Sequence, residues 1–92
     1  MANNPERYRH KVHTIAAIQC DQTFRNIISI LTWGADSGQF THHMNLGKCV
    51  LIVGTAEGNK TVNAGDWVVK YDTGEFDVIT DADLTADYEK IA

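Results

Sequence analysis

The chain is poor in cysteine, with only Cys20 and Cys49 in 92 residues. Small domains that rely on disulfides carry more cysteines than this, so a disulfide scaffold is not indicated. In a reducing cytosol we expect both thiols to be small packing residues, and not members of a disulfide, a metal site or a nucleophilic pair.

Long apolar runs are also absent. No stretch approaches the roughly 20 residues that a membrane-spanning helix needs. The first ten residues, MANNPERYRH, contain no apolar core of the kind that signal peptides have. We therefore expect no membrane contact and predict a cytoplasmic protein.

Catalytic and metal-binding motifs are missing as well. His10 and His13, or the adjacent His42 and His43, could offer two imidazoles to a metal. On a strand, however, residues one or three apart point to opposite faces, and neither pair has the spacing of a zinc site. No Gly-rich phosphate loop is present. The sequence thus predicts no enzyme, no cofactor and no metal.

The length and the 43% hydrophobic content indicate one globular domain over residues 1–92, with residues 1–6 expected to be disordered. Alternating or continuous apolar runs predict strands. The fold class expected is α+β: an antiparallel β-sheet of four to five strands with one α-helix packed on one face. The main strand candidates are Val12–Gln19, Lys48–Thr55, Lys60–Val62, Trp67–Tyr71 and Glu75–Ile79, with a closing strand near the C-terminus.

The helix is expected between Asp21, as its N-cap, and Gly34. Its apolar stripe has the spacing i, i+3, i+4 and i+7, which should face the sheet; its members are Phe24, Ile27, Ile28 and Leu31. Residues 35–47 show no regular period and are predicted to be a long loop. A helical turn is expected at residues 81–86, capped by Thr80 or Asp81.

The second half of the chain resembles a small family of bacteriophage and prophage proteins, the PGDYG-type domains. The matching segments are Ala64-Gly65-Asp66-Trp67, Gly74-Glu75-Phe76 and Tyr88-Glu89-Lys90-Ile91. Ala64 and Lys90 stand where the family usually has proline. Tyr8-Arg9-His10-Lys11 and Ala17-Ile18-Gln19 are looser matches in the first half. The resemblance implies a fold and a phage origin, hence residence in the host bacterial cytoplasm, but no reaction.

Charge is unevenly placed along a chain of net charge −4. Arg7, Arg9 and Lys11 form a basic opening, whereas residues 72–89 hold seven acids and no Lys or Arg. These acids are Asp72, Glu75, Asp77, Asp81, Asp83, Asp87 and Glu89. Such a run is usually a solvated face. The alternative is an acidic surface that imitates nucleic acid and docks on a basic groove of a partner.

These observations favour a non-enzymatic phage protein that inhibits a host defence system. In size and type it resembles small phage anti-CRISPR inhibitors, which bind Cas proteins with guide RNA and block target DNA recognition. We expect no binding to free DNA. The partner-binding residues predicted are Arg7, Arg9, Lys11, His42, His43, Asp72, Glu75, Asp77, Asp81 and Asp83. Two alternatives stay open: an oligomeric sponge for a nucleotide signal, with a pocket of Trp33, Phe40, His42 and His43 at a subunit boundary, and a minor virion structural protein.

Overall fold

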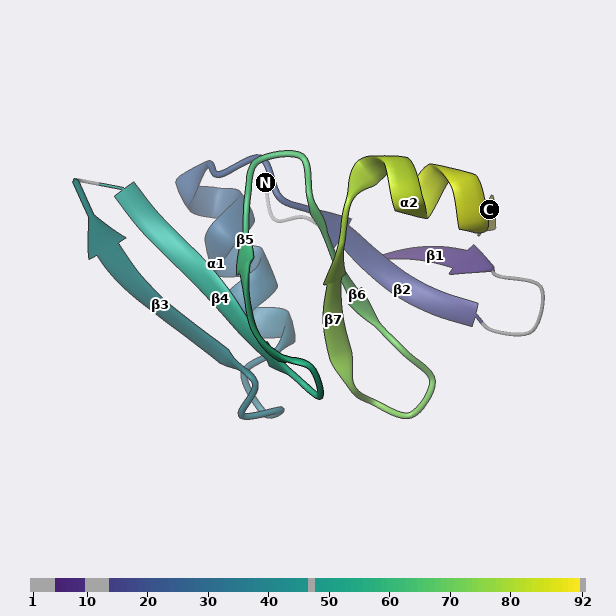
Figure 1. Cartoon of the computed structure of the whole chain (residues 1–92), viewed down its shortest axis with the longest axis horizontal. Helices are drawn as coiled ribbons and strands as arrows, with labels where there is room; N and C mark the ends of the chain where they lie inside the picture. Colours follow the sequence, from purple (N-terminus) through teal and green to yellow (C-terminus); the bar gives the residue numbers. More distant parts are fainter. Residues whose placement is uncertain (1–4, 10–13, 47, 92) are drawn as a thin grey trace.

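Two antiparallel sheets and two helices make up the fold in the computed structural model, which describes residues 5–9, 14–46 and 48–91 (Figure 1). The strands are β1 (Glu6–Arg9), β2 (Thr14–Gln19), β3 (Phe40–Asn45), β4 (Lys48–Thr55), β5 (Gly58–Val62), β6 (Trp67–Lys70), β7 (Phe76–Ile79) and β8 (Glu89–Ile91). The helices are α1 (Phe24–Trp33) and α2 (Asp81–Asp87).

The larger sheet has the strand order β7-β6-β2-β1-β8, and the smaller sheet has the order β3-β4-β5. All their pairings are antiparallel. The predicted α+β class is therefore confirmed. The expectation of one sheet with four to five strands and one helix is matched only roughly, because the described residues form eight strands in two sheets and a second helix.

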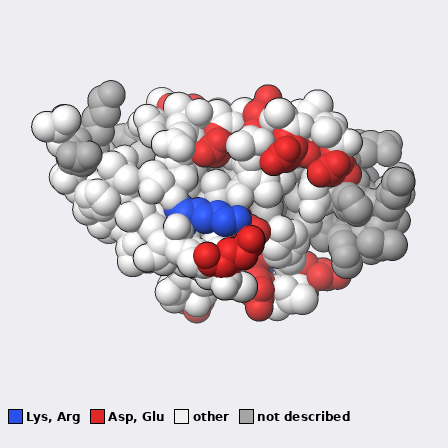
Figure 2. Space-filling model, in the orientation of Figure 1, with Lys and Arg blue, Asp and Glu red and all other residues white. Residues whose placement is uncertain are grey.

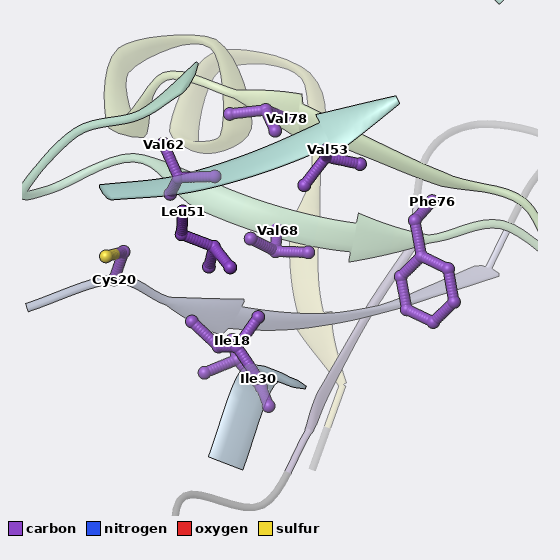
Figure 3. Packing of buried hydrophobic residues seen from close by; sticks show 9 residues of the cluster. All are labelled: Ile18, Cys20, Ile30, Leu51, Val53, Val62, Val68, Phe76 and Val78. Atoms are coloured by element: carbon purple, nitrogen blue, oxygen red, sulfur yellow. The ribbon is translucent and has the colours of Figure 1, made fainter. Parts of the chain in front are cut away.

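The main core lies between the two sheets and α1 (Figure 3). Alternate residues of β2, β6 and β7 face it from the larger sheet, while β4 and β5 face it from the smaller one. Ile30 of α1 is fully buried there. The cluster consists of Ile18, Cys20, Ile30, Leu51, Val53, Val62, Val68, Phe76 and Val78.

The opposite face of the larger sheet is covered by α2, through the buried Leu84. Trp67 and Val69 point to this side, and their neighbour Val68 points to the main core, so β6 is buried on both faces. Thr80 caps α2 by accepting a hydrogen bond from the amide of Asp83, which confirms one of the two caps expected. A strand buried on both faces explains why the sequence of β6 is so apolar.

Helix α1 begins two residues later than expected and presents a different face. Thr23, and not Asp21, is its N-cap. The buried face runs through Asn26 and Ile30, while Phe24 is 80% exposed and Ile28 is 45% exposed. The predicted stripe is therefore correct for only two of its four members, since Ile27 is buried and Leu31 packs half-buried against the core.

Asn26 explains this rotation of α1. Its side chain accepts a hydrogen bond from the amide of Asp21 (2.9 Å) and donates one to the carbonyl of Gln19 (2.8 Å). A buried amide needs such partners, and these lie on the segment that joins β2 to the helix. The two bonds hold the Asn26 side of α1 against the body of the protein.

The predicted loop at residues 35–47 contains β3, which is a second correction. Phe40–Asn45 pairs with residues 48–53 of β4, from Phe40 opposite Val53 to Asn45 opposite Lys48. The middle of the strand, Thr-His-His, is polar at consecutive positions. It therefore lacks the apolar–polar alternation by which a strand is predicted. At the other end of the chain, β1 begins at Glu6, inside the segment expected to be disordered; residues 1–4 lie outside the described residues.

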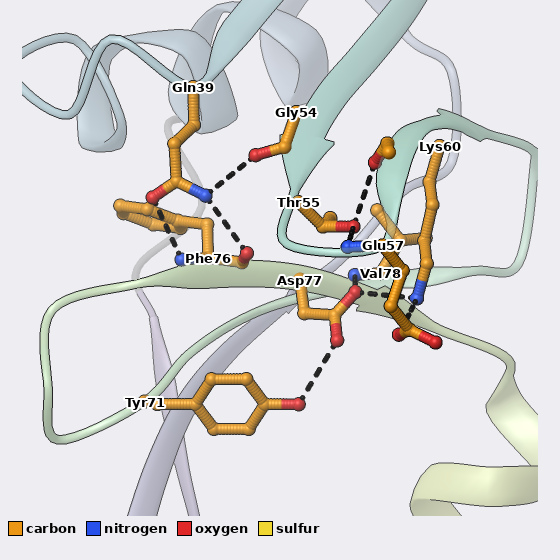
Figure 4. A network of polar contacts seen from close by, with 10 residues as sticks. Gln39, Gly54, Thr55, Glu57, Lys60, Tyr71, Phe76, Asp77 and Val78 are labelled. Carbon is orange, nitrogen blue, oxygen red and sulfur yellow. Dashed lines mark hydrogen bonds and ion pairs between the residues drawn. The ribbon is translucent and has the colours of Figure 1, made fainter.

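Gln39 joins the two sheets (Figure 4). Its side-chain nitrogen donates to the carbonyls of Gly54 (2.9 Å) and Phe76 (3.1 Å), and its oxygen accepts from the amide of Phe76 (3.1 Å). The backbone carbonyl of Gln39 also accepts a bond from the amide of Gly54. One residue thus connects β4 of the smaller sheet to β7 of the larger one.

Candidate functional site

Two acids of the predicted acidic face accept hydrogen bonds from other side chains of the chain; Asp77 is half-buried and Asp81 is exposed. Asp77 accepts hydrogen bonds from the Lys60 ammonium (2.9 Å) and the Tyr71 hydroxyl (3.3 Å) (Figure 4). Asp81 accepts one from the indole nitrogen of Trp67 (2.9 Å). These carboxylates have structural partners, so they are poorly placed to bind another molecule.

The Asp77 network also shifts two pKa values. A hydrogen bond from Lys60 to Asp77 raises the pKa of the Lys60 ammonium. Burial, followed by the nearby charge of Asp77, raises the pKa of the Tyr71 phenol to about 12. The Asp77 carboxylate therefore interacts with both Lys60 and Tyr71, and the positive charge of Lys60 neutralises its negative charge locally.

Four further acids of the predicted face are exposed and fall into two groups, whereas the side chain of Glu89 lies outside the described part of the structure. Asp72 and Glu75 lie in the turn between β6 and β7, and Asp83 and Asp87 lie on α2. Strand β7 separates the groups by roughly 13 Å, at about 3.3 Å per residue. Figure 2 shows acidic surface over α2 and the turns, whereas the surface over β3 carries neither charge colour. The predicted acidic face is thus divided into two exposed clusters, and the hydrogen-bonded Asp77 lies between them along the chain.

The basic opening of the chain is only partly described. Arg7 and Arg9 lie in β1, where the backbone of Arg7 pairs with Ile91 and that of Arg9 with Glu89. Lys11 lies outside the described residues. The backbone of β1 therefore places Arg7 and Arg9 in the same sheet as the acidic β6–β7 turn.

The four residues of the pocket expected at a subunit boundary do not come together within one chain of the described structure. Trp33 and Phe40 pack edge-on against Phe76, with ring centroids 5.0 and 4.9 Å away, at the border of the core. His42 and His43 are both exposed and, as adjacent strand residues, point to opposite faces of β3. Of these four residues, His42 lines one apolar pocket, and the other three do not line that pocket.

That pocket is an apolar groove between α1 and β3, which the sequence reasoning missed. Its volume is about 520 Å³, within the range of roughly 300–1,000 Å³ that is usual for ligand sites. The sequence does contain a signal for this groove, namely the apolar stripe of the helix, but its spacing predicts that the stripe faces the sheet. The groove is lined by Gln22, Phe24, Ile27, Ile28, Leu31, His42, Met44 and Cys49.

Metal and thiol chemistry gain no support from the described residues. Within residues 5–9, 14–46 and 48–91, no group of three or more His, Cys, Asp or Glu side chains is arranged to hold a metal ion. Both cysteines are free; Cys20 is buried, and Cys49 is half-buried in the groove. Burial raises the pKa of the Cys20 thiol, which disfavours the reactive thiolate.

The helices of the described structure are also too short and too polar to cross a bilayer. Comparisons of the chain with protein-family models, with curated proteins and with solved structures gave no match.

Proposed function

We propose that this protein is a phage-encoded, non-enzymatic binding protein that inhibits a host defence system. Its target in this proposal is a CRISPR–Cas surveillance complex, and its effect is to block recognition of target DNA. The observation that carries the proposal is the pair of exposed acidic clusters, at the β6–β7 turn and on α2. The resemblance to phage PGDYG-type domains in the Gly65-Asp66 and Gly74-Glu75-Phe76 segments supports a phage origin.

The charges in these clusters are available to a partner. Among the side chains that the structure describes, no Lys or Arg lies within ion-pair distance of Asp72, Glu75, Asp83 or Asp87, whereas Lys60 pairs with Glu57 and Asp77. A CRISPR effector holds its guide RNA and target DNA in positively charged channels. Exposed carboxylates on a small rigid domain can occupy such a channel and compete with the phosphates of DNA.

The first experiment is affinity capture of the tagged protein from the lysate of a CRISPR-bearing bacterium, with identification of co-eluting proteins and RNA. Stoichiometric recovery of Cas subunits with guide RNA supports the proposal. Recovery of the protein alone contradicts it and favours a virion structural role, which copurification with phage particles would test.

Paired neutralising variants test the surface. Asp72→Asn with Glu75→Gln removes the charge at the turn, and Asp83→Asn with Asp87→Asn removes it from α2. The matched control is Asp21→Asn with Asp36→Asn, two exposed acids outside both clusters. We expect at least one test pair to slow association with the complex by roughly 10-fold or more at low salt, and the control pair to have little effect. Equal effects of all three pairs would remove the acidic-surface mechanism.

The nucleotide-sponge alternative has weaker support. The groove beside α1 is lined mainly by apolar side chains, and none of its lining residues is Lys or Arg. A nucleotide phosphate is usually held by cationic side chains or by backbone amides at a helix N-terminus. No rise in melting temperature across a nucleotide panel would count further against this alternative.

A further inference from the structure

The exposed apolar surface of the described structure is concentrated at one place, beside β3. Its four large, exposed hydrophobic side chains are Phe24 (80% exposed), Ile28 (45%), Met44 (65%) and Leu46 (95%). Phe24, Ile28 and Met44 line the groove, and Leu46 lies in the turn that follows β3. Single exposed apolar residues are common on soluble proteins, whereas a contiguous patch indicates a docking surface.

The backbone at this patch is unusual in two places. Gln22 and Leu46 are the non-glycine residues with positive φ among those described, at 62° and 51°. Left-handed backbone favours Gly, Asn or Asp. Turn formation therefore does not account for a leucine at position 46, whose side chain is 95% exposed.

Strand β3 lies at a sheet edge and lacks the usual protection of edges. It pairs with β4 on one side and with no described strand on the other. Natural edge strands are commonly blocked by Lys, Pro or a bulge, but Phe40–Asn45 reads FTHHMN and pairs with β4 without interruption. The surrounding segment, residues 37–47, contains no Asp, Glu, Lys or Arg, in a chain with 22% charged residues.

We propose that β3 pairs with β3 of a second copy of this chain, to form a symmetric dimer with one continuous six-stranded sheet. Antiparallel pairing of a strand with its own copy has a two-fold axis perpendicular to the sheet. That axis places the two α1 helices on the same face, on either side of the joint. The exposed Phe24 and Ile28 and the half-buried Leu31 of one copy then pack against the same residues of the other, and the two sets of side chains fill the groove.

Charge and area both favour a second copy as the occupant. Each chain has a net charge of −4, so an uncharged surface is where two copies meet with the least repulsion, and residues 37–47 provide one. The four exposed apolar side chains present roughly 170–340 Å² per copy, on the basis of about 1.5–3 kcal/mol for a large apolar side chain and about 25 cal/mol per Å². Backbone of β3 and the other groove residues can supply the rest of the roughly 800 Å² per partner that stable interfaces bury.

The test is the mass of the full-length protein in solution, by sedimentation and native mass spectrometry from micromolar to sub-millimolar concentration. We expect a concentration-dependent dimer. Phe24→Glu should raise the dimer dissociation constant by roughly 100-fold or more, because the charge enters the interface once from each copy. Thr61→Glu, at an exposed position on the opposite edge strand β5, is the matched control and should leave the dimer intact.

A second variant separates loss of the contact from loss of folding. Leu46→Asn removes the exposed apolar side chain and introduces a residue that tolerates left-handed backbone. We expect it to weaken the dimer while the monomer keeps or gains thermal stability. Amide hydrogen exchange shows where the interface lies. In the wild-type protein, protection of the β3 amides that point away from β4 should rise with protein concentration. In the Phe24→Glu variant, this protection should not rise.

Three results would overturn the proposal: a wild-type chain that stays monomeric at sub-millimolar concentration, a dimer that tolerates both Phe24→Glu and Leu46→Asn, or a dimer whose β3 amides gain no protection. If a monomer binds the apolar dye anilinonaphthalenesulfonate and Phe24→Glu abolishes that binding, the groove belongs to a different partner. Failure here leaves the proposed function intact, because that function rests on the exposed acids of α2 and the β6–β7 turn.

Discussion

Replacing Gln39 with methionine should weaken the connection between the two sheets and lower the free energy of unfolding. The substitution keeps the length of the side chain but removes its hydrogen bonds to Gly54 and to both backbone groups of Phe76. Each such bond contributes roughly 1 kcal/mol net, and an unsatisfied buried group costs about 1–3 kcal/mol. Because Gln39 is only half-buried, water can partly replace the lost partners. We expect a loss of roughly 2–3 kcal/mol in the free energy of unfolding.

That loss is large for a chain of this size. Domains are stable by roughly 0.05–0.15 kcal/mol per residue, which gives about 5–14 kcal/mol here. The melting temperature should fall by roughly 10–20 °C, since each kcal/mol shifts it by about 4–8 °C in small domains. Urea unfolding followed by tryptophan fluorescence measures the free energy, and hydrogen exchange at the Phe76 amide reports the broken contact directly.

Gln19→Met is the matched control for this measurement. Gln19 is exposed, and its side chain donates to the carbonyl of Gly65 (3.1 Å), in the turn that precedes β6. We expect a change below about 0.5 kcal/mol there, as for most surface substitutions. The reasoning is refuted if Gln39→Met also costs less than about 0.5 kcal/mol and leaves exchange of the Phe76 amide unchanged.

Two further predictions concern the core border and the alkaline limit. Gly34→Ala should lower the free energy of unfolding by roughly 1–3 kcal/mol. The φ of −95° suits alanine, but the added Cβ would overlap the Phe40 ring. If the effects of Gly34→Ala and Phe40→Leu on urea unfolding are additive, this contact is contradicted. Tyr71, whose pKa is raised to about 12 in the folded protein, contributes stability that is present below its unfolded pKa of 10 and is lost as pH rises through about 12. Tyr71→Phe should therefore flatten the decline of unfolding free energy between pH 10 and 12, and an unchanged slope would refute the assignment.

The elements that the sequence predicted best are those whose own residues determine them. The strand predicted at Lys48–Thr55 has the bounds of β4, and its apolar run places Leu51 and Val53 in the core. The turn at Gly65 and Asp66 also behaves as expected. Gly65 has a φ of 92°, and the Asp66 carboxylate accepts a hydrogen bond from the amide of Asn63 (3.0 Å). Both signals are local, so pattern and turn chemistry suffice.

The errors arise where distant residues decide the outcome. An apolar count favours Phe24, Ile27, Ile28 and Leu31 as the inner face of α1, and it cannot detect that Asn26 has two backbone partners on the preceding segment. In the same way, Asp77 seemed to be one of a row of surface acids. Its partner Lys60 is 17 residues away and meets it because β5 lies beside β7. The acidic residues of the candidate site could be predicted, but their division into structural and exposed acids could not.

The two candidate surfaces follow from one arrangement of charge. The exposed acids of α2 and the β6–β7 turn lie toward one end of a molecule 40 Å long, and the uncharged edge strand β3 lies toward the other (Figures 1 and 2). Repulsion between like charges disfavours self-association through the acidic end, so that end remains free for a basic partner. Association through β3 would place the acidic ends of two copies far apart, where each is available. A dimer could then engage two basic sites, and the effective concentration of the second contact would depend on the spacing between those sites.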